Sequence, residues 1–194
     1  SAPMIDIYGL RFPRLLRALA EGLDMVGLGT AFVPGGSRTG VQERPFEGNV
    51  LTSDPARFAR TANILKAAPQ LGLGDPTVGW LNSAFRLMDE FSDAEYPRRI
   101  FTPTLVFGAG EDRVVSLPAL ERFATRLKVG RLIMIPESRH EILMERDHIR
   151  AQFWAAFDAF IPGQHFSVAS LEAEAEAKRA LRARRRWFRR GQAA

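Results

Sequence analysis

The chain has 194 residues, of which 46% are hydrophobic and 25% charged, so it can bury a core and is not compositionally disordered. It holds no cysteine, which excludes disulfides and thiolate metal sites and is compatible with a reducing compartment, so a cytoplasmic location is expected. No apolar run approaches the roughly 18 residues of a membrane span. The net charge of +5 resides in residues 171–194, which leaves residues 1–170 neutral and predicts no nucleic-acid partner.

Residues 9–98 are predicted to form a helical insertion, because their apolar residues recur at helical spacing between breaks rich in Gly and Pro. Helices are expected at residues 12–23, 56–67 and 78–91. The second of them follows an Asp-Pro pair, which supplies an N-cap and a first-turn proline.

Three apolar residues of the third expected helix, Trp80, Leu81 and Phe85, are candidates for the lining of a substrate site. Side chains of this kind belong more often to a core, but burial of apolar surface is also the natural way to hold an acyl chain. We therefore keep both interpretations for these three residues.

Residues 99–165 show the alternation of an α/β fold, with a strand at 104–108, a helix at 118–126, a strand at 131–135 and a long helix at 147–160. Both strands are continuous apolar runs, as is typical of parallel strands covered by helices on both faces. Two strands cannot complete such a sheet, and further strands are expected upstream of residue 1.

Two polar residues follow these strands at the points where the strands end. Asp112 comes after the first strand and His140 after the second, in the order that a hydrolase triad has along the chain. We predict that Asp112 orients the imidazole of His140, which acts as general base and then as general acid. The alternative interpretation is a loop-capping Asp and a surface His.

No nucleophile accompanies this pair, because the chain holds no G-x-S-x-G pentapeptide; the nearest approach, around Ser37, has Thr39 in place of the last Gly. No metal is expected, since Met144 stands where the zincin motif H-E-x-x-H needs its second His. No cofactor is expected either, since Arg113 occupies the position of the third glycine of a dinucleotide-binding fingerprint. The catalytic serine is therefore expected upstream of residue 1.

Five segments in combination resemble bacterial lysophospholipases, α/β-hydrolases that are similar to monoacylglycerol lipases. They lie at residues 1–4, 51–54, 75–80, 110–116 and 139–145. The resemblance implies the C-terminal portion of an α/β-hydrolase fold, with residues 1–8 as the end of a core strand and residues 9–98 as a cap over the acyl site. It implies that Asp112 and His140 are the catalytic acid and base of a serine hydrolase that cleaves the acyl ester of a lysophospholipid or monoacylglycerol. This chain alone is expected to be inactive.

Two other functions stay open at this point. The first is an esterase or peptidase of the same fold that acts on a soluble substrate. The second is a non-catalytic module that binds a membrane or a partner protein. Residues 166–194 are predicted to form a basic helical tail, interpreted as a solvated helix or as a peripheral contact with an anionic membrane.

Overall fold

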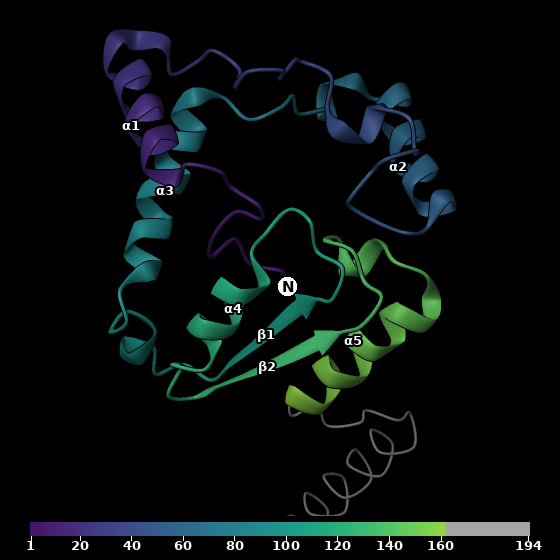
Figure 1. The fold of residues 1–194 in the computed structure, drawn as a ribbon. Helices are drawn as coiled ribbons and strands as arrows, with labels where there is room; N and C mark the ends of the chain where they lie inside the picture. Colours follow the sequence, from purple (N-terminus) through teal and green to yellow (C-terminus); the bar gives the residue numbers. More distant parts are fainter. Residues whose placement is uncertain (162–194) are drawn as a thin grey trace, which may run out of the picture. The chain divides into compact units, whose positions relative to one another are not determined.

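The structure is a computed structural model in which residues 1–161 are described (Figure 1). Residues 1–156 form one compact unit, which contains both strands and the loops that follow them. The α-helices are α1 (Pro13–Leu23), α2 (Pro55–Ala67), α3 (Val78–Ser92), α4 (Leu117–Ala124) and α5 (Asp147–Phe160), and the strands are β1 (Thr104–Ala109) and β2 (Gly130–Ile135).

The two strands form a parallel sheet, in register from Thr104 opposite Gly130 to Ala109 opposite Ile135. Helices cover both faces of the sheet. Successive residues of β1 point to opposite faces, and each packs against a different helix. Val106 lies in one buried cluster with Leu120 of α4, whereas the ring of Phe107 lies 4.3 Å, centroid to centroid, from that of Phe153 in α5. The prediction of parallel strands covered on both faces is confirmed.

Within residues 9–98, α1 and α3 pack side by side (Figure 1). Their shared core consists of buried Ala20 from α1 with Ala84, Phe85 and Met88 from α3. Asp54 caps α2, because its carboxylate accepts hydrogen bonds from the amides of the first helical turn, as the Asp-Pro pair predicts.

Two features differ from expectation. Residues 1–8, predicted as the end of a core strand, contain no strand; they hold an isolated antiparallel bridge from Ile7 to Val115, and the amide of Ala2 donates to the carbonyl of Phe107. A π-helical turn, Asp24–Leu28, follows α1 and contains Gly27 at a φ of 85°, which only glycine adopts without strain. Neither feature has a periodic signal in the sequence.

Among residues 1–161, no helix combines the length and the apolar character needed to cross a bilayer. The predicted basic tail at residues 166–194 lies outside the described residues.

Candidate active site

The loops that follow β1 and β2 are bonded to each other at the carboxyl end of the sheet. The amide of Gly110 donates to the carbonyl of Ile135 at 2.9 Å, and the amide of Glu111 donates to the carbonyl of Ser138 at 2.8 Å. A Cβ on Gly110 would lie 3.1 Å from that Ile135 oxygen, so a glycine allows this close approach. The two loops therefore lie side by side, and each presents its polar residue at the same edge of the sheet.

The structure brings Asp112 and His140 together, as the sequence predicts. Oδ2 of Asp112 lies 2.9 Å from Nδ1 of His140. Because an ionised carboxylate can only accept, Nδ1 carries the proton of this bond, and in the neutral ring Nε2 then has the lone pair. The Asp112 side chain is fully buried and that of His140 is 25% exposed, so the pair has one protected and one accessible end.

Hydrogen bonds keep the Asp112 carboxylate ionised despite its burial. Burial opposes the charge, but the His140 ring and the amides of Val115 and Val114, at 3.0 and 2.8 Å from Oδ1, outweigh it, so that the pKa of this carboxyl lies below its ordinary value. An ionised acceptor holds an imidazole in one tautomer and stabilises the imidazolium that forms during proton transfer.

This lowered pKa predicts a contribution to acid stability. A carboxyl whose pKa is lower in the folded state stabilises the fold above the pKa of the unfolded chain, near 4, and loses that contribution as the pH falls further. Between pH 5 and pH 3, the native protein should therefore lose more free energy of unfolding than Asp112→Asn does, as measured by urea denaturation. An equal loss in both proteins would contradict this account of the carboxylate.

Further polar contacts connect the His140 loop to the chain that precedes α2. Glu145 is fully buried and accepts from the amides of Arg139 and Ser53. Thr52, also fully buried, donates through Oγ1 to the carbonyl of Met144 at 2.7 Å. Both segments belong to the resemblance to lysophospholipases, but their sequence carries no sign that they meet.

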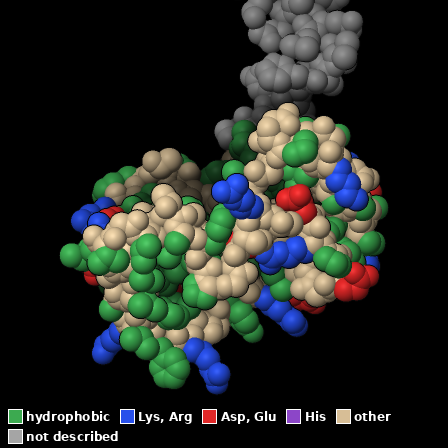
Figure 2. All heavy atoms as spheres, turned by 90° about the horizontal axis from the view of Figure 1, so that it is seen from above, with side chains coloured by type: hydrophobic (Ala, Val, Ile, Leu, Met, Phe, Trp, Pro, Cys, Tyr) green, Lys and Arg blue, Asp and Glu red, His purple; other side chains and the backbone are tan. Residues whose placement is uncertain are grey.

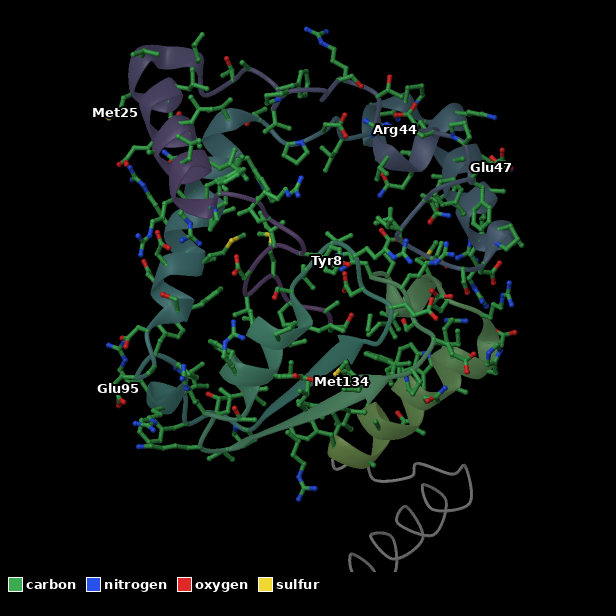
Figure 3. The ribbon with its side chains drawn as sticks, viewed as in Figure 1. Tyr8, Met25, Arg44, Glu47, Glu95 and Met134 are labelled. Atoms are coloured by element: carbon green, nitrogen blue, oxygen red, sulfur yellow. The ribbon has the colours of Figure 1, made fainter. Side chains whose placement is uncertain are left out.

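Two hollows adjoin the Asp112 loop. One of about 600 Å³ is lined by Tyr8, Leu117 and Glu121 together with the loop itself, and another of about 310 Å³ is lined by residues 46–50, Arg139 and the same loop. Figure 3 shows Tyr8 above the strands and Glu47 on the side of α2. Asp112 itself lines the larger hollow, and Arg139, the residue before His140, lines the smaller one.

The three candidate lining residues of α3 have different positions. Phe85 is only 2% exposed, in the core between α1 and α3, and Leu81 packs against the same cluster. Trp80 is half exposed. The structure thus places Phe85 in the core of the helical insertion and leaves Trp80 as the most accessible of the three.

Exposed hydrophobic side chains gather elsewhere on the insertion, as Figure 2 shows for the face seen from above. The most exposed include Phe12 and Leu15 at α1 and Met25 and Val26 in the turn after it. Figure 3 shows Met25 beside α1, and this residue belongs to the turn that follows the helix. Exposed apolar patches of this kind mark surfaces that bind a ligand, a membrane or another protein segment.

Within residues 1–161, no serine hydroxyl is hydrogen-bonded to His140. Ser138 is fully buried and its Oγ donates to the carbonyl of Arg139, while Ser37 lies in the loop before α2, where its Oγ donates to the carbonyl of Thr39. In the same part of the chain, no three His, Asp or Glu side chains are grouped so that they could hold a metal ion.

A family model described as serine aminopeptidase, S33, matches residues 1–147. Among curated proteins, a probable lysophospholipase L2 of Haemophilus influenzae is 24% identical over 161 residues, which cover 83% of this chain and 50% of the relative. Lysophospholipase L2 of Escherichia coli K12 is 30% identical over 119 residues, which cover 55% of this chain and 33% of the relative. The chain thus spans half or less of the length of these relatives, and its resemblance to bacterial lysophospholipases is confirmed.

A crystal structure of a monoacylglycerol lipase from Paleococcus ferrophilus is also similar, with a TM-score of 0.61 at 17% identity. The superposition covers 82% of this chain and 56% of that chain. At this identity the likeness shows the fold alone, and it confirms that residues of this chain form part of an α/β-hydrolase fold.

Proposed function

This chain belongs to the serine aminopeptidase S33 family of α/β-hydrolases, and we propose that it supplies the acid and the base of a serine hydrolase that cleaves the acyl ester of a lysophospholipid or monoacylglycerol. The observation that carries the proposal is the hydrogen bond between buried Asp112 and partly exposed His140 at the ends of two adjacent parallel strands. The proposal assigns the nucleophile to a serine that this sequence does not hold.

In the proposed reaction, Nε2 of His140 takes the proton of the serine hydroxyl while the serine oxygen attacks the ester carbonyl. The imidazolium, stabilised by Asp112, then gives that proton to the departing glycerol oxygen, and an acyl-enzyme remains. Water, deprotonated by the same nitrogen, then attacks the acyl-enzyme. The nitrogen returns this proton to the serine oxygen as the bond to the acyl group breaks and the fatty acid is released. Asp112 stays ionised throughout, as its lowered pKa requires.

We assign residues 9–98 the role of a cap over the acyl chain, with Trp80 as a candidate contact. Support comes from the lysophospholipase relatives and from the exposed apolar side chains of this segment. Because Phe85 lies in the core of the segment, we assign it a structural role there. A cytoplasmic location and peripheral contact with an anionic membrane remain predictions.

A comparison of substrates tests the lipid assignment. The native protein that carries this chain should hydrolyse a long-chain lysophospholipid with a kcat/KM at least 10-fold above that for a short-chain soluble ester. Burial of each additional methylene group is worth about 0.8 kcal/mol, so two more buried methylene groups already correspond to more than about 10-fold. His140→Ala should lose hydrolysis of both substrates, and that loss would show that both activities come from this site.

Other outcomes identify the alternatives. A higher kcat/KM for the soluble ester would assign the site to an esterase, and turnover of amino-acid amides alone would assign it to a peptidase of the same family. Hydrolysis of none of these substrates by the native protein would favour a non-catalytic binding module.

A further inference from the structure

A second fully buried carboxyl group near His140 takes no part in the proposed reaction. Glu145 lies five residues after His140 and is fully buried, which is costly for a carboxylate unless hydrogen bonds compensate. Its oxygens accept from the amide of Arg139 at 2.9 Å and from the amide of Ser53 at 3.0 Å. Oε2 also accepts from the hydroxyl of Ser53 at 2.5 Å.

The residues on both sides of His140 are bonded to one short segment, residues 49–54, which we call the cap strap. On the preceding side, the guanidinium of Arg139 donates to the carbonyls of Asn49 and Thr52 at 3.1 and 3.0 Å. On the following side, the amide of Glu141 donates to the carbonyl of Leu51 at 2.8 Å. The cap strap therefore holds His140 from two directions.

Glu145 closes this arrangement, because it bonds the cap strap through Ser53 and the His140 loop through the amide of Arg139. Within the described residues, the ring of His140 has one hydrogen bond of its own, to Asp112. The orientation of the ring therefore depends on how firmly the adjacent backbone is held.

We propose that Glu145 is a positioning residue, which fixes the backbone of residues 139–141 against the cap strap and so keeps the His140 ring within hydrogen-bond reach of Asp112. Only the catalytic consequence rests on the proposed function, since the hydrogen bond itself can be observed in any case. A displacement of about 1 Å at a catalytic group lowers a rate by roughly 100-fold.

The test compares Glu145→Gln with the matched control Glu90→Gln, which changes an exposed glutamate of α3. Glutamine has the shape of glutamate but carries no charge, and its amide nitrogen cannot accept. The Ser53 amide therefore keeps one of its two acceptor oxygens, and the Ser53 hydroxyl has to accept from that nitrogen instead of donating. In the native protein, the low-field proton resonance of His140 Nδ1–H, assigned by its absence in His140→Ala, reports the bond to Asp112. We expect this resonance in the native protein and Glu90→Gln, and its loss or an upfield shift in Glu145→Gln.

Ester hydrolysis gives the second measurement. Glu145→Gln should lower kcat by about 10- to 100-fold and leave KM within about 2-fold, since the change affects proton transfer and not substrate binding. Should Glu145→Gln fail to fold, Ser53→Ala carries the same test. It removes only the hydroxyl donor, with an expected loss in kcat of about 3- to 10-fold and a smaller shift of the resonance.

Each outcome decides one of the two proposals. A resonance and a kcat in Glu145→Gln that match those of Glu90→Gln would overturn the positioning role, and so would absence of the resonance from the native protein. If the native protein hydrolyses no ester while Glu145→Gln still loses the resonance, the proposed function fails and the positioning role stands.

Discussion

Replacement of His140 with alanine is expected to lower the kcat/KM of the native protein by about 10⁴- to 10⁶-fold and to abolish its labelling by a fluorophosphonate. The expected loss is this large because the serine hydroxyl reacts only when its proton is taken, and His140 Nε2 is the base in the proposed reaction. The measurement is steady-state ester hydrolysis, together with labelling of the purified variant.

His148→Ala is the matched control, since this histidine is exposed at the start of α5. It should retain full activity and labelling, and its thermal stability should match that of the native protein. Labelling of His140→Ala at the native rate would rule out His140 as the base.

Replacement of Asp112 with asparagine is expected to lower kcat by about 10⁴-fold. The asparagine oxygen can still accept from the amides of Val114 and Val115, so the loop keeps its bonds. Its NH₂ group would instead face Nδ1 of His140 and donate to it. That arrangement moves the ring proton to Nε2, where it blocks uptake of the serine proton.

The control for this variant is Asp89→Asn, which changes an exposed aspartate of α3 that forms an ion pair with Arg17. Ester hydrolysis should be unaffected by it. If Asp112→Asn were folded and retained more than about a tenth of the native kcat, Asp112 would not be the residue that sets the tautomer of His140.

Much of the fold near the site follows from local sequence. The apolar runs of β1 and β2 are long enough and continuous enough to predict parallel strands, and the Asp-Pro pair at 54–55 predicts the start of α2. Because the ends of adjacent parallel strands meet at one edge, the position of Asp112 beside His140 also follows.

The contacts that hold this pair in place could not be predicted in the same way. Glu145 and Ser53 are separated by 92 residues, and their hydrogen bond leaves no periodic pattern in either segment. The position of Phe85 was equally open, because helical spacing shows which face of α3 is apolar but not whether another helix or a substrate covers it. The turn after α1 depends on a single glycine, Gly27, whose positive φ the sequence does not specify.

The position of the fluorophosphonate adduct in the native protein shows directly whether Asp112 and His140 serve a serine nucleophile. After labelling, proteolysis and mass spectrometry of the peptides identify the modified residue. We expect one modified serine, outside residues 1–194, and no adduct in the His140→Ala variant. An adduct on a serine within residues 1–194, or no adduct in an active native protein, would contradict the assignment of Asp112 and His140 to a serine hydrolase whose nucleophile lies elsewhere.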